Sequence, residues 1–127
     1  MKLAELIFER VSPTQMHDVE KFADALWGKL GIDVSFTKHF LDRVNDERNG
    51  KEISAAELIR LFKKEYEKFG KNVKAMDGDD EAVFRDLMTL VNLPFVLKDT
   101  DKGKTLVAKT VMRKQDFKSQ TPTLDIK

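Results

Sequence analysis

The 127-residue sequence contains no cysteine, only two histidines, three prolines and six glycines, and no long hydrophobic run. Without cysteine the chain can form neither a disulfide nor a thiolate metal site, and it has no thiol nucleophile. Two histidines cannot complete the usual three-ligand zinc site without a carboxylate. We therefore predict no metal and no cofactor. The apolar stretch Leu3–Phe8 is short and interrupted by Glu5, so we also expect neither a signal peptide nor a membrane segment.

An excess of one charge is also missing, because 23 Lys and Arg oppose 22 Asp and Glu for a net charge of +1. This balance excludes the bulk positive charge of histone-like or heparin-binding proteins. The acidic run at residues 77–81 lacks the EF-hand ligand spacing and is expected to cap the element that follows it. Residues 93–127, however, carry eight basic and four acidic side chains, a local charge of +4. Such a region can bind an anion, and it can equally keep a sheet edge from pairing with other chains.

A capping box predicts the first well-defined helix. Ser12 and Gln15 have the spacing of the two reciprocal caps, and Pro13 suits the first helical position. Apolar residues then recur at helical spacing as far as Gly31, which we expect to end the helix. The segment 3–11 has weaker helical spacing and is predicted to be a short helix that folds back on the longer one.

Two more helices are predicted in the middle of the chain. Thr37 is a plausible N-cap for a short helix over Lys38–Val44. Ser54 and Glu57 form a second capping box, which begins an amphipathic helix that we expect to end at Gly70. The N-terminal half of the sequence is therefore mainly helical.

The C-terminal part changes to the alternating pattern of β-strands. Strands are predicted over Leu93–Leu97, Lys104–Arg113 and Thr123–Ile126, a brief extended segment over Ile32–Phe36, and either a helix or a strand over 82–91. Pro94 cannot donate a hydrogen bond to a neighbouring strand, so we expect it at a strand start or edge. The fold class that follows is α+β in a single domain, with helices packed on a C-terminal antiparallel sheet.

His39 and Arg43 are the first candidate functional residues. Because they are four residues apart on a predicted helix, their side chains project from the same side. An imidazole can transfer protons near neutral pH, and a guanidinium presents a planar fork to phosphate oxygens. The alternative is an exposed histidine beside a surface pair of Arg43 with Asp42 or Asp46.

The segment His39–Arg43, together with Glu57–Phe62 about fifteen residues later, resembles the RegB-like phage endoribonucleases. In that family a His-x-x-Asp-Arg helix precedes a second helix with a Glu-Leu-Phe segment. The family looks like part of the group of small metal-independent ribonucleases that includes RelE, barnase, EndoU and the colicin nucleases. The resemblance implies a nuclease-like core over residues 34–127, with residues 1–33 as an N-terminal helical extension.

Residues 34–127 also look like an uncharacterised protein type of marine phage genomes. The similar segments are Arg43–Asn49, Asn92–Phe95 and Ala108–Lys114. This similarity implies a phage protein. We expect it in the cytoplasm of an infected host cell, with the virion as the alternative location.

The resemblance nominates His39 and Arg43 as catalytic residues of a metal-independent endoribonuclease that cleaves RNA by attack of the 2′-hydroxyl. Lys63 stands where the RegB pattern has its second catalytic histidine, and it becomes the third catalytic candidate. Lys109, Arg113 and Lys114 are the RNA-binding candidates, because strand alternation predicts that Lys109 and Arg113 share one face. RNA is thus the expected partner, with no membrane contact. The alternative is a non-catalytic phage accessory or virion protein that binds nucleic acid, or a host or phage protein, on the same scaffold.

Overall fold

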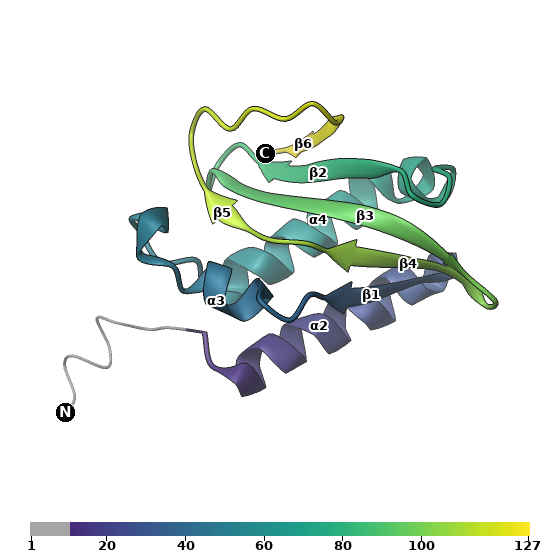
Figure 1. The fold of residues 1–127 in the computed structure, drawn as a ribbon, viewed down its shortest axis with the longest axis horizontal. Helices are drawn as coiled ribbons and strands as arrows, with labels where there is room; N and C mark the ends of the chain where they lie inside the picture. The colour runs from purple at the N-terminus through teal and green to yellow at the C-terminus, as the bar shows by residue number, and fades with distance from the viewer. Residues whose placement is uncertain (1–10) are drawn as a thin grey trace.

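The computed structural model describes residues 11–127, and both capping boxes begin long helices there (Figure 1). The Ser12 side chain accepts the backbone N–H of the third helical position at 3.1 Å and so opens α2 (Pro13–Trp27). A 3₁₀ turn, η1 (Gly28–Leu30), extends this helix until Gly31, whose φ of 77° is readily adopted only by glycine. The predicted start and end are therefore confirmed. The weaker predicted helix lies almost wholly outside the described residues.

The second capping box opens α4 (Ala55–Lys74), but the predicted end at Gly70 is wrong. The helix continues through Gly70, which is buried against Leu30 of η1. A Cβ atom at this position would lie 2.9 Å from Leu30 Cδ1, closer than side chains normally approach. Gly70 therefore serves close helix packing rather than helix termination.

The short middle helix is also smaller than predicted. It is α3 (Phe40–Val44), and a 3₁₀ turn, η2 (Glu47–Asn49), follows it. Thr37 does not cap it, because the Thr37 hydroxyl donates instead to the carbonyl of Lys109 at 2.8 Å. That bond ties the start of the α3 segment to the sheet.

The strands form one six-stranded mixed sheet, so the α+β class is confirmed while the purely antiparallel arrangement is wrong. The strands are β1 (Ile32–Phe36), β2 (Glu81–Asp86), β3 (Val91–Thr100), β4 (Gly103–Ala108), β5 (Met112–Arg113) and β6 (Thr123–Ile126). Their order is β1-β4-β3-β2-β6, and β5 pairs with β3. The pairs β1–β4 and β2–β6 are parallel, whereas the pairs that involve β3 are antiparallel.

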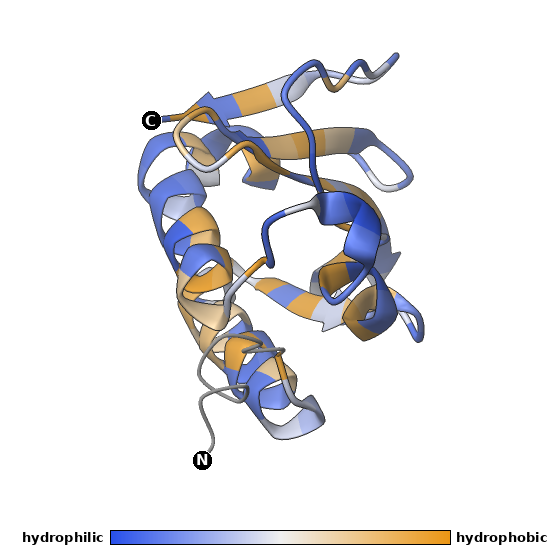
Figure 2. Cartoon of the chain, turned by 90° about the vertical axis from the view of Figure 1, so that its left-hand side faces the viewer, coloured by the Kyte–Doolittle hydropathy of each residue, from blue (hydrophilic) through white to orange (hydrophobic). Residues whose placement is uncertain are grey.

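The core lies between the sheet and the helices α2 and α4, which pack side by side on one sheet face (Figure 1). Figure 2 shows hydrophilic residues on the outer sides of these helices. The fully buried Trp27 of α2 stacks on Phe84 with ring centroids 5.5 Å apart, and Phe84 lies 4.5 Å from Phe95. This aromatic cluster joins α2 to the central strands β2 and β3.

The boundary predicted between an extension and a core, at residues 33 and 34, falls inside β1. The backbone N–H groups of Val34 and Phe36 donate to the carboxylates of Asp24 and Glu20 on α2, at 2.9 and 2.8 Å. These carboxylates occupy the hydrogen-bonding positions that an edge strand would offer to another chain. Within the described residues, α2 therefore shares one core with the rest of the chain.

Glu65 is the one acidic side chain of α4 that points into this core. The residue is 0% exposed, and neither carboxylate oxygen has a hydrogen-bond partner among the described residues. Burial raises the pKa of Glu65 to about 9, and the negative charge of the Asp125 carboxylate adds to the shift. At neutral pH the folded protein therefore holds a protonated Glu65.

We expect this buried acid to make stability fall as the pH rises. Between pH 4.5 and about 9 the unfolded chain loses the Glu65 proton while the folded chain keeps it, which lowers the free energy of unfolding by about 1.4 kcal/mol per pH unit. Glu65→Gln should remove this slope and stabilise the protein by roughly 3 kcal/mol at pH 7. Urea unfolding at several pH values measures how the free energy of unfolding of each protein changes with pH. Glu67→Gln, at an exposed position of α4, is the control, and equal pH slopes in the two variants would contradict the prediction.

Candidate functional site

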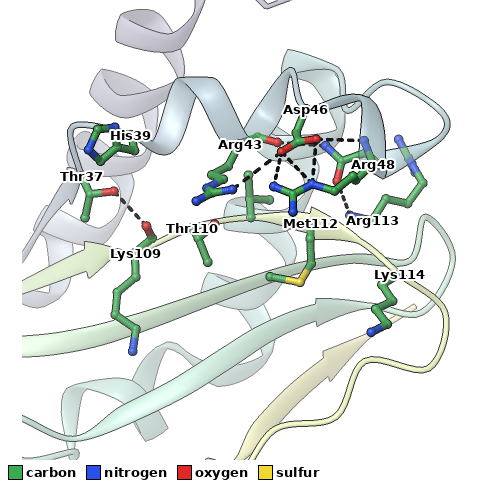
Figure 3. A pocket seen from close by; sticks show the side chains of 12 residues that line it. Thr37, His39, Arg43, Asp46, Arg48, Lys109, Thr110, Met112, Arg113 and Lys114 are labelled. Carbon is green, nitrogen blue, oxygen red and sulfur yellow. Dashed lines mark hydrogen bonds and ion pairs between the residues drawn. The ribbon is translucent and has the colours of Figure 1, made fainter.

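A pocket of about 920 Å³ lies where the α3–η2 segment faces the end of the sheet (Figure 3). It is lined by Thr37, His39, Arg43, Asp46, Arg48, Asn49, Lys109, Thr110, Val111, Met112, Arg113 and Lys114. Five of the six predicted site residues are in this set, although they come from two segments about 70 residues apart in the sequence. Lys63 is absent from it, and its side chain is exposed on α4. Lys63 is therefore not part of the candidate site.

A β-bulge forms the sheet side of the pocket. Phe95 pairs with Ala108 and Asn92 pairs with Met112, so two residues of β3 oppose the three residues 109–111. One of the two is Pro94, which cannot donate to its neighbour; its carbonyl still accepts the N–H of Lys109 at 3.0 Å. The predicted strand over Lys104–Arg113 is therefore interrupted, and β4 and β5 are separate strands.

Because of the bulge, Lys109 and Arg113 point to opposite faces of the sheet. One extra residue in a strand moves every following side chain to the other face. Lys109 forms an ion pair with Glu81 at the open face of the sheet, whereas Arg113 reaches Glu57 at the start of α4, on the helix face. The prediction that Lys109 and Arg113 share one face is thus wrong.

Two buried asparagines hold the pocket walls together. Asn49 Nδ2 donates to the carbonyls of Arg43 and Val44 at 2.9 and 3.2 Å, and Asn49 Oδ1 accepts the Arg113 N–H at 3.0 Å. Asn92 Nδ2 donates to the carbonyls of Leu90, Met112 and Lys114. The α3–η2 segment and the bulged strand are therefore bonded directly to each other. The sequence indicated only turn chemistry at Asn49 and Gly50, and nothing local marks a long-range contact.

Arg113 is a structural residue in this pocket. Its side chain is 10% exposed, and its guanidinium donates to the Glu57 carboxylate at 2.8 and 3.1 Å and to the carbonyls of Lys51, Glu52 and Thr89. Burial alone would raise the pKa of Glu57, but the hydrogen bonds from Arg113 and from the Ser54 backbone outweigh it and lower that pKa. Every guanidinium nitrogen of Arg113 is thus already used by the protein.

The other basic side chains that line the pocket differ in how far acidic side chains of the protein neutralise their charge. Arg48 binds Asp46 through two nitrogens, at 2.7 and 3.2 Å, and Lys109 pairs with Glu81. Among the described residues Arg43 forms one ion pair, with Asp46 at 3.7 Å, and its side chain is 49% exposed. The Lys114 ammonium has no recorded partner among residues 11–127. Arg43 and Lys114 are therefore the pocket cations most available to an anion.

His39 lies at the pocket rim, immediately before α3. Its side chain is 73% exposed, and Nδ1 lies 3.7 Å from the Asp42 carboxylate. The His39 carbonyl accepts the N–H of Arg43, so the two residues stand one helical turn apart. Figure 3 shows both side chains on the same side of the bulged strand, whereas the ends of the Lys109 and Lys114 side chains extend to its other side. Of the two surface pairs that the sequence offered as alternatives for Arg43, the one with Asp46 is present.

Arg48 was not singled out from the sequence, and Asp46 was named there only as a possible surface partner of Arg43. Hydrogen bonds from the Arg48 side chain and backbone lower the pKa of Asp46 to about 2, so this carboxylate is ionised at neutral pH. The signal that could have revealed them is the density of charge in residues 42–48, directly after His39.

Chemically, the pocket presents one imidazole and a surplus of cations to a ligand. Residues 11–127 hold no group of three or more acidic or histidine side chains arranged to bind a metal ion. None of the helices in this part of the chain combines the length and hydrophobicity of a membrane span. The arrangement suits an anionic ligand whose reaction needs proton transfer.

Comparison with protein families finds no matching family, and neither the curated proteins nor the solved structures include a significant match. The sequence and the pocket itself are therefore the basis for a functional proposal.

Proposed function

We propose that this protein is a phage endoribonuclease that cleaves RNA without a metal ion. The main support is the position of His39 and Arg43 on a pocket with five basic side chains and a single acid, Asp46. Phosphate oxygens are recognised by such cations, and by the fork of an arginine above all. The sequence resemblance to RegB-like nucleases involves the same histidine and arginine.

The reaction would begin with His39 as general base. The imidazole takes the proton of the RNA 2′-hydroxyl, the 2′-oxygen bonds to phosphorus, and the bond from phosphorus to the 5′-oxygen breaks. The leaving 5′-oxygen receives a proton from solvent or from the imidazolium, which leaves a 2′,3′-cyclic phosphate and a 5′-hydroxyl. Arg43 would stabilise the extra negative charge on the phosphorus oxygens in the transition state. Asp42, 3.7 Å from His39 Nδ1, would orient the imidazole.

The second candidate is a protein that binds RNA in the same pocket without cleaving it. It is favoured by the absence of a second histidine from the pocket and by the exposure of Lys63 on α4. Binding requires only the cations, and phosphate contacts need no proton transfer.

Cleavage of end-labelled single-stranded RNA in the presence of EDTA separates the two candidates. We expect cuts with 2′,3′-cyclic phosphate ends from the wild type, and we expect His39→Ala to abolish them. His17→Ala is the matched control, because His17 is exposed on α2 and lies outside the pocket. RNA binding without any cut would support the second candidate, and cleavage that survives His39→Ala would exclude His39 as the base.

A further inference from the structure

Asp46 occupies an unusual position for an acid, because it lies between two arginines of a pocket that is otherwise basic. Figure 3 shows its carboxylate between Arg43 and Arg48. Asp46 Oδ2 lies 2.7 Å from one terminal nitrogen of Arg48 and 3.7 Å from one of Arg43. Two guanidinium groups thus share one internal anion.

The backbone fixes this carboxylate. Asp46 is the N-cap of η2, and its Oδ1 accepts the Arg48 N–H at 2.9 Å. Arg48 Nε lies 3.2 Å from both carboxylate oxygens, so the contact is a fork on a planar anion, the geometry that arginine also uses for phosphate. The arginines, by contrast, are accessible to a ligand, since the Arg43 and Arg48 side chains are 49% and 78% exposed.

We infer that Arg43 and Arg48 form a phosphate subsite of the RNA pocket, which Asp46 fills in the absence of ligand. This inference rests on the proposed binding of RNA in the pocket, but not on cleavage. The Arg43 and Arg48 side chains are 49% and 78% exposed, so a backbone phosphate can reach both guanidinium groups and replace Asp46 as their anion. Asp46 is then an internal competitor that lowers the affinity of the pocket for RNA.

Asp46→Asn tests this role without removing the cap. Asparagine caps helical turns as well as aspartate does, and its oxygen can still accept the Arg48 N–H. The variant loses the negative charge and one of the two acceptor oxygens that hold the arginines. Asp101→Asn is the control with the same change of charge; Asp101 is exposed in the β3–β4 turn, at the end of the sheet opposite α3 (Figure 1).

The probe is a fluorescent single-stranded 2′-O-methyl oligoribonucleotide of about 12 nucleotides, which no 2′-hydroxyl attack can cleave. We expect Asp46→Asn to bind it about three- to fivefold more tightly than the wild type at low salt, in keeping with the loss of one exposed ion pair. The slope of log affinity against log salt should become steeper by about 0.7, the value for one more phosphate contact on a single strand. Adding Arg48→Ala to Asp46→Asn should cancel both gains.

Equal affinity and equal salt slope in Asp46→Asn and Asp101→Asn would overturn the subsite. If the wild type bound the probe but did not cleave natural RNA, the proposed endoribonuclease activity would be refuted. The comparison of Asp46→Asn with the wild type would still test the proposed phosphate subsite. Binding that appears only in Asp46→Asn would support the subsite. No binding by any variant, with folding verified by circular dichroism, would overturn both the subsite and the RNA site.

Discussion

Replacing Arg43 with alanine is expected to lower the rate of RNA cleavage about 100-fold or more. Removal of one preorganised donor to a developing oxyanion typically has an effect of this size. Arg43 suits that role because it shares the pocket with His39 and its one ion pair within residues 11–127 is with Asp46, at 3.7 Å. The same contact is exposed, so its loss should hardly change the free energy of unfolding.

Single-turnover cleavage at saturating enzyme measures this effect, with urea unfolding as the test of the fold. Arg43→Lys should retain part of the rate, since a lysine keeps the charge but lacks the fork. Lys29→Ala removes one positive charge in η1, outside the pocket, and should cleave as the wild type does. A loss near twofold in Arg43→Ala would exclude Arg43 as a stabiliser of the transition state.

Replacing Arg113 with alanine is expected to destabilise the fold by about 3–5 kcal/mol, the usual cost of removing one partner of a buried ion pair. The change leaves the largely buried Glu57 carboxylate without its counterion and three backbone carbonyls without their donor. The stability that this pair contributes also depends on pH. Because the pKa of Glu57 is lowered in the folded state, the contribution of its charge to the free energy of unfolding is complete above about pH 4.5. This contribution is lost as the pH falls through the folded pKa.

The midpoint of urea unfolding at pH 7 gives the effect of Arg113→Ala on stability. Lys114→Ala, at the neighbouring residue, is the matched control. Its ammonium has no ion-pair partner in the described part of the chain, so we expect a nearly unchanged midpoint together with weaker RNA binding. If Arg113→Ala unfolded like the wild type but bound RNA poorly, then Arg113 would be a ligand-binding residue and its structural role would be refuted.

The parts of the fold that depend on local chemistry were predictable from the sequence. Ser12 and Ser54 begin helices because a hydroxyl and a glutamine or glutamate three residues later satisfy N–H groups within the same turn. Gly31 ends its helix because its backbone conformation is available to glycine without strain. His39 and Arg43 could be placed on one side of the chain for the same reason, since the spacing of a helical turn is local.

Other features depended on contacts between distant segments. Gly70 has the local signature of a helix end, yet the approach of Leu30 from another helix gives it a packing role. The direction of strand pairing was likewise not encoded in the alternation of β1 or β6, because alternation defines two faces and says nothing about the neighbour. Both strands pair in parallel with strands that are distant in the sequence.

The candidate site combines both kinds of information. The sequence by itself determined the residue types: two capped helices, an imidazole beside a guanidinium, and a basic C-terminal third. The tertiary structure alone decided which cations are available to a ligand. A single extra residue opposite Pro94 places the side chains of Lys109 and Arg113 on different faces of the sheet. The physical reason is that the chemical type of a side chain is a property of one residue. The face of the sheet on which that side chain lies depends on the register with the neighbouring strand.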